Sequence, residues 1–358
     1  MTGRPGSSRD DGAPYEIVDA LHDLAERRDL SREQSRSVMR QIMEGGATAS
    51  QIGAYLMGLR MKGETVAELT GAAEVMRALV TGVASNRRPL VDTCGTGGDL
   101  SGSYNVSTAV AFVAAGAGVA VAKHGNRSVS SKAGSADVLE ALGVRIDLPP
   151  EGMSRCLDEV GIAFLYAPRL HGSMKHAAAT RREMKLRTMF NLLGPLTNPA
   201  GAKRQLLGVF DGGFAERVAG VLRALGSEHA WVVHGADGMD EISITGPSVA
   251  FEVRGDAPIR RLEIDPTAYG LALGRREEIA GGDPQQNALW LTALLENRVD
   301  DGSRRMVTLN AAAALVVAGQ APGIPEGLAL AESSLQTGRA RATLEGLRKL
   351  TCELGGPA

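Results

Sequence analysis

Residues 91–112, VDTCGTGGDLSGSYNVSTAVAF, contain a short apolar run, a glycine-rich polar loop and then a helical pattern that begins near Asn105. Glycine lets backbone amides approach an anion closely because it carries no Cβ. The N-terminus of a helix adds unpaired N–H groups and about half a positive charge. A loop of this kind after a strand predicts a phosphate-binding site, and a tight turn capped by Asn105 is the alternative interpretation.

Strand-like and helical patterns alternate around and beyond this stretch. The expected strands are the apolar runs at 90–93, 119–123, 162–167, 205–210 and 229–235. Helical stretches at 105–117 and 135–142 follow the first two of these runs. This alternation is typical of a parallel sheet that is covered by helices.

The pattern changes after Glu241. Short runs that predict antiparallel strands at one edge of the sheet are ISIT at 242–245, SVAFEVR at 248–254 and IRRLEI at 259–264. Three helical stretches are then expected near 283–297, 303–318 and 326–353. We therefore expect a mainly parallel but mixed sheet.

The N-terminal region has helical periodicity and no strand pattern. Apolar residues recur at helical spacing between Tyr15 and about residue 84, which predicts four short helices. Ser31, Thr48 and Ser50 precede apolar runs as N-caps do, since their side chains can accept from free amides. We expect a flexible tail at 1–13, a small helical domain at 14–86 and an α/β domain at 87–358. Helices around 172–193 are expected to join the small domain in space.

Composition and charge exclude several classes of protein. The 358 residues include 45 glycines without a Gly-X-Y period, and 44% of residues are hydrophobic, which excludes collagen and a disordered chain. With a formal net charge of −2, the whole chain has no electrostatic reason to bind nucleic acid or an anionic membrane. Cys94, Cys156 and Cys352 form no metal-ligand pattern and favour a reduced, cytoplasmic setting.

Two common phosphate-binding motifs do not match the sequence. A dinucleotide fingerprint that began at Gly95 would need glycine at Leu100. A Walker A loop that ended at Lys132 would need glycine at Ser131 and Ser or Thr at Ala133. Neither NAD nor an ordinary P-loop nucleotide is therefore indicated.

A second loop, AKHGNRSVSSKAGSAD at 122–137, combines the cations Lys123 and Arg127 with clustered hydroxyl groups. Arg127 can bind phosphate through two N–H groups, whereas Lys123 acts as a point charge. Together with the serines they predict a polydentate anion site. A solvated polar loop with Ser135 as a helix cap explains fewer of these residues.

Two further segments have chemistry that depends on their surroundings. The adjacent carboxylates Asp240 and Glu241 in HGADGMDEIS, 234–243, predict a Mg²⁺ site near the phosphate loops, and taken alone they are a charged turn. The basic stretch at 174–201 is either a solvated helix or one from which an arginine faces inward to hold an anionic acceptor. Apart from Phe190 it lacks the interleaved aromatic residues that stack on nucleic acid.

The segments GTGGD, NVST, KHGNRSVSSK, RTMFNLLGPLTNPAG and HGADGMDE together resemble the anthranilate phosphoribosyltransferase family. The resemblance runs from about Tyr15 to Leu350 and implies a nucleoside phosphorylase/phosphoribosyltransferase-like fold, with a small helical domain and a larger α/β domain. It also implies a homodimer assembled through the helical part and Mg²⁺ as the cofactor. The implied reaction transfers the phosphoribosyl group of 5-phosphoribosyl 1-diphosphate (PRPP) to anthranilate, the second step of tryptophan biosynthesis from chorismate.

The resemblance assigns roles to individual residues. PRPP would be bound by Gly95, Gly98, Asp99, Ser103, Asn105, Val106, Ser107, Thr108, Lys123, His124, Gly125, Asn126, Arg127, Ser128, Val129, Ser130, Ser131 and Ser135. Anthranilate would contact Gly95, Asn126 and Arg181, the last of which would orient it. Ser107, Asp240 and Glu241 would hold magnesium. No general base is obvious, and His124 is the nearest candidate.

The chain departs from the family pattern at a few positions. Leu100 stands where glycine is common, and Met184-Lys185 stands where Leu-Gly is usual. Neither change removes a donor or a metal ligand. They affect the first loop and the helix beside Arg181, not the reaction class.

Three other functions stay open at this point. A pyrimidine nucleoside phosphorylase should carry its Lys-His pair directly before the first glycine loop, whereas Lys123-His124 lies in a later loop. A nucleic-acid-binding paralogue should have lost the KHGNR and DE segments, which are intact here. A paralogue that acts on another aminobenzoate is compatible with the sequence.

Overall fold

The computed structural model describes residues 14–98, 102–128 and 132–355, and these divide into two units. One unit contains the residues up to Val75 together with Ser173–Met189. The other contains Met76–Gly172 and the residues from Phe190 onward. Within the described ranges, no helix combines the length and the apolar character needed to cross a bilayer.

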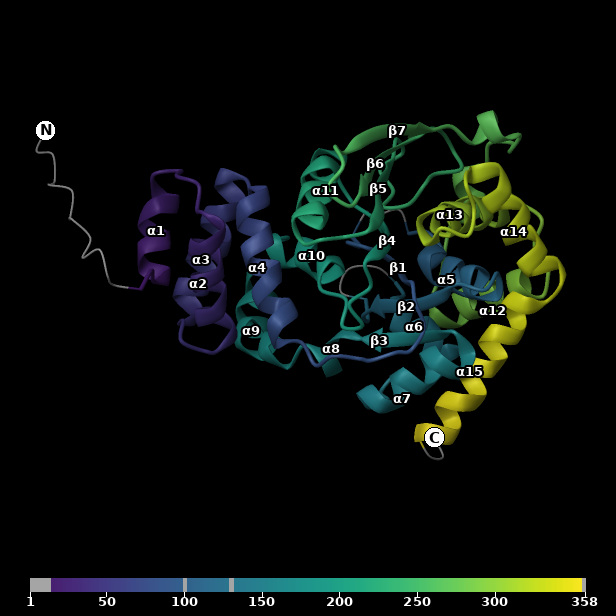
Figure 1. The fold of residues 1–358 in the computed structure, drawn as a ribbon, viewed down its shortest axis with the longest axis horizontal. Coiled ribbons are helices and arrows are strands. Elements are labelled where there is room, and N and C mark those ends of the chain that lie inside the picture. Colours follow the sequence, from purple (N-terminus) through teal and green to yellow (C-terminus); the bar gives the residue numbers. More distant parts are fainter. Residues whose placement is uncertain (1–13, 99–101, 129–131, 356–358) are drawn as a thin grey trace, which may run out of the picture. The chain divides into compact units, whose positions relative to one another are not determined.

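The helical unit is built on the helices that the N-terminal periodicity predicts (Figure 1). They are α1 (Ile17–Ala25), α2 (Arg32–Met43), α3 (Ala49–Lys62) and α4 (Val66–Leu79), and α9 (Lys175–Met184) packs against α2 and α3. Two of the predicted N-caps are confirmed: Ser31 Oγ accepts from Gln34 N at 3.2 Å, and Thr48 Oγ1 accepts from Gln51 N at 3.3 Å. The prediction for Ser50 is wrong, because Thr48 caps α3 and Ser50 lies within the helix. Each cap satisfies an amide that the helix itself leaves unpaired.

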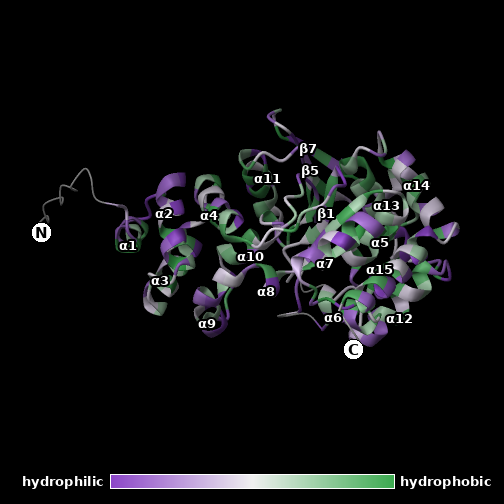
Figure 2. Ribbon diagram, turned by 60° about the horizontal axis from the view of Figure 1, so that its bottom comes forward, coloured by the Kyte–Doolittle hydropathy of each residue, from purple (hydrophilic) through white to green (hydrophobic). Residues whose placement is uncertain are grey.

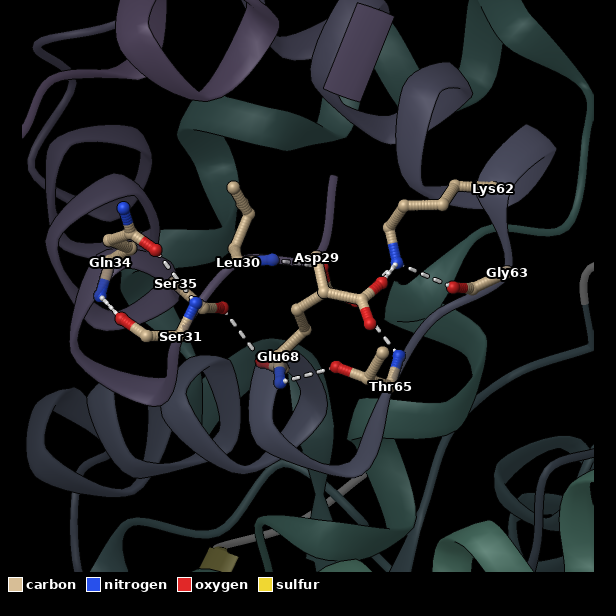
Figure 3. Close-up of polar contacts among 9 residues, drawn as sticks. All are labelled: Asp29, Leu30, Ser31, Gln34, Ser35, Lys62, Gly63, Thr65 and Glu68. Atoms are coloured by element: carbon tan, nitrogen blue, oxygen red, sulfur yellow. Dashed lines mark hydrogen bonds and ion pairs between the residues drawn. The ribbon is translucent and has the colours of Figure 1, made fainter. Parts of the chain in front are cut away.

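A buried carboxylate connects three segments of this unit (Figure 3). Glu68 is 0% exposed, and its Oε1 accepts from Leu30 N at 2.8 Å. Its Oε2 accepts from Thr65 N at 2.8 Å and from Lys62 Nζ at 3.1 Å. Lys62 also donates to Asp29 Oδ1 at 2.7 Å, so the charge of Glu68 is paired inside the protein.

The α/β unit contains a seven-stranded sheet with strand order β3-β2-β1-β4-β5-β6-β7. The strands are β1 (Leu90–Gly95), β2 (Ala120–Gly125), β3 (Ile162–Tyr166), β4 (Arg204–Gly208), β5 (His229–Gly235), β6 (Ser248–Arg254) and β7 (Arg260–Ile264). The first five are parallel neighbours, and β6 and β7 add on antiparallel. The predicted mainly parallel, mixed sheet is confirmed.

The strand order reverses between β1 and β4, and this reversal positions the site. Helix α5 (Val106–Gly116) connects β1 to β2 in one direction, whereas α11 (Ala215–Ala224) connects β4 to β5 in the other. Because such crossovers are right-handed, the two helices lie on opposite sides of the sheet (Figure 1). Open sheets of this kind bind ligands beyond the carboxyl ends of the strands at the reversal.

The remaining helices cover the sheet and its ends. Those of one turn or more are α6 (Ser135–Ala141), α7 (Pro150–Arg155), the π-helical η1 (Cys156–Val160), α8 (Ala167–Leu170), α10 (Met189–Leu193), α12 (Pro284–Leu295), α13 (Gly302–Ala318), α14 (Ile324–Gln336) and α15 (Arg339–Gly355). Short 3₁₀ turns are η2 (Gly172–Met174), η3 (Gly194–Leu196), η4 (Gly212–Phe214), η5 (Pro266–Tyr269) and η6 (Arg276–Ile279). Buried apolar residues of α5 and α13 pack against the sheet, as their hydropathy indicates (Figure 2).

Two secondary-structure predictions are wrong. ISIT at 242–245 is not a strand, because side chains take up its backbone groups: Ile242 N bonds to Asn310 Oδ1 at 2.9 Å and Ser243 N bonds to Ser248 Oγ at 2.8 Å. The stretch at 326–353 is two helices, α14 and α15, instead of one. Gly338 between them has φ 72°, which the interior of a helix cannot accommodate.

Replacement of the buried carboxylate should destabilise the protein much more than replacement of an exposed one. Glu68→Ala leaves Lys62 without one of its two carboxylate partners and should lower the free energy of unfolding by about 3–5 kcal/mol. Glu33→Ala is the control, because Glu33 is 79% exposed in its pair with Arg36 and should cost less than about 1 kcal/mol. Urea denaturation measures both, and equal losses would contradict the role given to Glu68.

Candidate active site

Asp240 lies against the carboxyl ends of β1 and β4, with its side chain at Gly95 and its main chain at Gly208. A Cβ on Gly95 would collide with Asp240 Oδ2, and one on Gly208 would collide with the Asp240 carbonyl oxygen. Gly97 N donates to Asp240 Oδ2 at 2.8 Å. The glycines of the first loop therefore admit a carboxylate at the end of the sheet.

Glu241 is held by the start of α5, where the first loop ends. Its Oε1 accepts from Ser107 N at 3.1 Å, which places a negative charge at the N-terminus of that helix. Ser107 also faces the second loop, since Lys123 Nζ donates to Ser107 Oγ at 3.2 Å. The structure thus brings together the three residues that the resemblance assigns to magnesium with one of the predicted cations.

Lys123 is buried at the end of β2 and is 3% exposed. Its ammonium donates to Thr93 O at 2.6 Å in addition to Ser107. Burial lowers the pKa of Lys123, and the charges of Asp92, Glu241 and Asp240 oppose this shift. A cation held in this way is fixed in place before any anion arrives.

Asp92 is a fully buried carboxyl group to which the sequence analysis gave no role. Its Oδ1 accepts from His124 N at 3.1 Å, and its Oδ2 accepts from Asn198 Nδ2 at 2.8 Å. Burial raises its pKa, and the Asn198 hydrogen bond and the Lys123 charge act in the opposite direction. Its acidic side chain within an otherwise apolar strand was the signal that could have revealed this role.

The ring of His124 contacts the ring of His171, with 3.2 Å between their Nε2 atoms. The carbonyl of Gly194 accepts a hydrogen bond from the same His124 ring. Burial lowers the pKa of His124 to about 3 and that of His171 to about 4, and the two charges would also repel each other. This geometry favours an orienting role for the His124 imidazole over the role of a general base.

The second loop bends back onto α6. Arg127 donates to both carboxylate oxygens of Glu140, at 2.6 and 2.7 Å, and to Asp137 at 3.0 Å. A Cβ on Gly125 would come within 2.5 Å of Ser135 Oγ, which itself donates to Asn126 O at 3.3 Å. The guanidinium of Arg127 is therefore paired with acidic groups of α6 in this structure.

The other predicted site residues are distributed as follows. Val106 and Thr108 are buried at the start of α5, where their backbone amides belong to the first turn. Asn105 precedes this helix, but its side chain makes no cap hydrogen bond there. Gly98, Ser103 and Ser128 lie in the two loops, while Asp99, Val129, Ser130 and Ser131 fall outside the described residues.

Arg181 lies in α9 of the helical unit. Its side chain is half-buried, and burial lowers the pKa of its guanidinium. Arg182, the next residue, is exposed. An arginine that is partly withdrawn from water binds a carboxylate more strongly than one on the surface.

Two residues that the sequence analysis missed hold the acidic loop. Asn310, fully buried in α13, donates to Ile242 O at 2.7 Å and accepts from Ile242 N at 2.9 Å. Asp237 accepts from the hydroxyls of Ser243 and Thr245 at 2.6 and 2.7 Å. The residues on both sides of Asp240-Glu241 are thus fixed by side chains.

Two family models match this chain. Residues 18–80 match the helical bundle domain of a glycosyl transferase family, and residues 87–341 match its a/b domain. This chain, which combines a helical unit with a doubly wound sheet that carries carboxylates at its strand reversal, is therefore a member of this glycosyl transferase family.

Curated relatives and solved structures show which members of the glycosyl transferase family this chain is similar to in sequence and fold. Anthranilate phosphoribosyltransferases of Symbiobacterium thermophilum and Pelotomaculum thermopropionicum are 53% and 52% identical to this chain, covering 93% and 94% of it and 97% of their own lengths. The crystal structure of anthranilate phosphoribosyltransferase from Thermus thermophilus is 40% identical, with a TM-score of 0.88 over 93% of this chain and 99% of that chain. The chain belongs to the anthranilate phosphoribosyltransferase family.

A more distant structure shares the fold. The anthranilate phosphoribosyltransferase of Saccharomyces cerevisiae, in complex with PRPP and Mg, is 24% identical, with a TM-score of 0.86 over 94% of this chain and 98% of that chain.

The buried histidine pair should make the protein sensitive to acid. A histidine whose pKa is lowered on folding binds a proton more readily in the unfolded chain, so the free energy of unfolding falls as the pH drops below about 6.5. Each histidine contributes up to roughly 1.4 kcal/mol per pH unit. His171→Gln should therefore give a shallower fall between pH 6.5 and pH 4 in urea denaturation.

His22→Gln is the matched control, because it removes an exposed histidine and leaves the buried pair intact. If His171→Gln and the unaltered protein lost stability at the same rate with falling pH, the assigned pKa direction would be wrong.

Proposed function

We propose that this enzyme transfers the 5-phosphoribosyl group of PRPP to the amino group of anthranilate, which gives N-(5-phosphoribosyl)anthranilate and pyrophosphate. The N–C1 bond forms, the C1–O bond to the diphosphate breaks, and the amine releases a proton. Membership of the family supports this proposal. The observation that carries it is the pair Asp240 and Glu241, held by backbone amides of the first loop and of α5, beside the buried cation Lys123.

The residues of this chain are suited to a reaction in which a leaving diphosphate must be stabilised. An aryl amine is a weak nucleophile, so the transition state should resemble an oxocarbenium ion, as at other anomeric centres. The fixed ammonium of Lys123 and the N-terminus of α5 place positive charge and N–H donors where negative charge would develop. Because both are already in place, little reorganisation is needed during the reaction.

Magnesium fits the donors that lie together at the strand reversal. Asp240, Glu241 and Ser107 offer carboxylate and hydroxyl oxygens, the hard ligands that Mg²⁺ prefers. Magnesium bound there would neutralise charge on the diphosphate of PRPP. The backbone amides of Gly97 and Ser107 orient the two carboxylates for this role.

The remaining assignments from the family resemblance are part of the same proposal. Arg181 would bind the carboxylate of anthranilate and Asn126 would contact the ring, so that the amine is aligned with C1. We place His124 among the orienting residues, because both sides of its ring are engaged by His171 and Gly194.

We also propose that the enzyme is a homodimer assembled through its helical unit. Large apolar side chains on that unit are exposed, among them Met61 at 64%, Met57 at 38% and Leu186 at 46%. Met57 and Met61 lie one turn apart on α3, and neighbouring exposed apolar side chains are typical of interaction surfaces. Analytical ultracentrifugation tests the assembly, and a monomer at micromolar concentration would contradict it.

Removal of the acidic pair should abolish most of the transfer. The fluorescence of anthranilate reports its consumption, which should require both PRPP and Mg²⁺. Asp240→Ala combined with Glu241→Ala should lower kcat/KM for PRPP at least about 100-fold at millimolar Mg²⁺, because a preorganised electrostatic group is lost. Phosphate-dependent release of a base without PRPP would instead indicate a phosphorylase.

The matched control is Asp256→Ala combined with Glu263→Ala, which removes two exposed carboxylates from the β6–β7 hairpin of the same unit. The control should retain activity within about twofold. Unchanged turnover in the Asp240/Glu241 variant would contradict the metal assignment.

Arg181→Ala tests whether Arg181 contributes to the binding of anthranilate and not to that of PRPP. Loss of a charge-assisted hydrogen bond to a carboxylate should raise KM for anthranilate roughly 10–100-fold, with KM for PRPP changed little. Arg182→Ala, at the exposed neighbouring position, should behave as the unaltered enzyme. Equal increases in both KM values for Arg181→Ala would rule out the acceptor role.

A further inference from the structure

A segment that no recognised motif includes pairs with the first phosphate loop. Ser103 forms a β-bridge with Ala280, Tyr104 N donates to Ile279 O at 3.1 Å, and Gly281 N donates to Gly102 O at 2.7 Å. These backbone bonds hold the loop directly before Asn105. We call residues 279–290, which continue into α12, the brace segment.

The pairing is close enough to demand glycine on one side. A Cβ on Gly281 would lie 2.5 Å from Ser103 O and 2.8 Å from Tyr104 N. Real Cβ atoms do not approach other atoms so closely. The brace segment and the first loop are therefore in direct backbone contact, not merely near each other.

Asn287 extends this contact to the second loop. It is 2% exposed in the first turn of α12, and its Nδ2 donates to Asn105 Oδ1 at 2.8 Å while its Oδ1 accepts from Gly282 N at 2.7 Å. Asn105 Nδ2 in turn donates to Ala133 O at 3.1 Å. Two amide side chains thus connect the brace segment, the first loop and the second loop in series.

An aromatic stack fixes the same end of the loop. The rings of Tyr104 and Trp290 lie 4.1 Å apart between centroids and 6° from parallel. Trp290 Nε1 donates to Ser303 Oγ at 2.9 Å, which ties the stack to α13. The residue next to Asn105 is therefore packed against a rigid pair of helices.

We propose that Asn287 is a positioning residue for PRPP binding, which holds Asn105 so that the first and second loops keep their spacing. The inference rests on the proposed function for the identity of the ligand. Asn105 uses its carbonyl for Asn287 and its amide N–H for Ala133, so this side chain acts between the loops. Its backbone leads into the turn of α5 that carries Ser107.

The energetic consequence follows from preorganisation. Loops that are ordered before the ligand arrives lose less conformational freedom on binding. Without Asn287, the carbonyl of Asn105 loses its donor, so the side chain whose Nδ2 donates to Ala133 O is no longer held in place. Part of the free energy of PRPP binding must then be used to order the two loops. The anthranilate contact assigned to Arg181 does not depend on the hydrogen bond between Asn287 and Asn105.

The test compares Asn287→Ala with Gln286→Ala. Gln286 precedes Asn287 in the same helical turn, and its amide oxygen likewise accepts from a backbone N–H, that of Asp283, at 3.0 Å. Titration calorimetry of each protein with PRPP and Mg²⁺, together with steady-state KM values, separates binding from turnover. Asn287→Ala should weaken PRPP binding and raise KM for PRPP about tenfold, with KM for anthranilate within twofold. Gln286→Ala should leave both unchanged.

Two further variants make the result independent of folding. Asn287→Asp has nearly the same shape, but it sets a carboxylate oxygen against Asn105 Oδ1. Asn105 can then satisfy either this group or Ala133 O but not both, so PRPP affinity should fall below that of the unaltered enzyme in titrations run well under the melting temperature of the variant. Combining Asn287→Ala with Asn105→Ala should weaken PRPP binding no more than the worse single change, because both break one link.

The outcomes are distinguishable. Equal PRPP affinity of Asn287→Asp and the unaltered enzyme, or additive losses in the double variant, would overturn the inference while the proposed function stands. Parallel increases in both KM values with a lowered melting temperature would reduce Asn287 to a general structural role and also overturn it. If the unaltered enzyme does not bind PRPP, the proposed function fails and the inference fails with it.

Discussion

The close approach of Asp240 to two glycines, by its carboxylate to Gly95 and by its carbonyl to Gly208, is the constraint on which the site depends. These glycines end β1 and β4, the two strands between which the strand order reverses. Because neither strand end carries a side chain, an acidic loop from beyond β5 can cross above the sheet and set its carboxylates against the amides of the first loop. Any side chain at either glycine would lift this loop, and the spacing between the carboxylates and α5 would be lost.

Positive and negative charges are balanced where the acidic loop passes above the ends of β1 and β4. Lys123 is withdrawn from water, yet its charge is compensated by the buried Asp92 and the half-buried Asp240 and Glu241. Asp92 is itself held by Asn198 and by the backbone of His124, which fixes the end of β2 relative to β1. The polar groups therefore form one network in which each member orients another, and such networks favour a single geometry over several.

Sequence patterns were informative where the physics is local and much less so where it is long-range. Capping residues, the strand alternation and the glycine loops were predictable because each depends on neighbours in the chain, as Ser31 with Gln34 illustrates. ISIT has the composition of a strand, but Asn310, 68 positions from Ile242 in the chain, bonds to its backbone, and no local pattern signals this. The same holds for Asn287 and Asn198, since a lone asparagine gives no sign of its distant partner. The residues recognised as motifs were those to which the family resemblance assigns substrates or magnesium, whereas the amides that support them were not recognised.

The stack of Tyr104 on Trp290 gives the molecule an internal optical probe. The chain contains two tryptophans, and the other, Trp231 in β5, donates its indole N–H to Glu252 at 3.2 Å. The emission of an indole depends on the rings and charges beside it. Displacement of residues 102–105 would therefore change the fluorescence of Trp290, and the fluorescence of Trp231 would serve as an internal reference. The conformation of residues 102–105 can in this way be followed in the unlabelled protein.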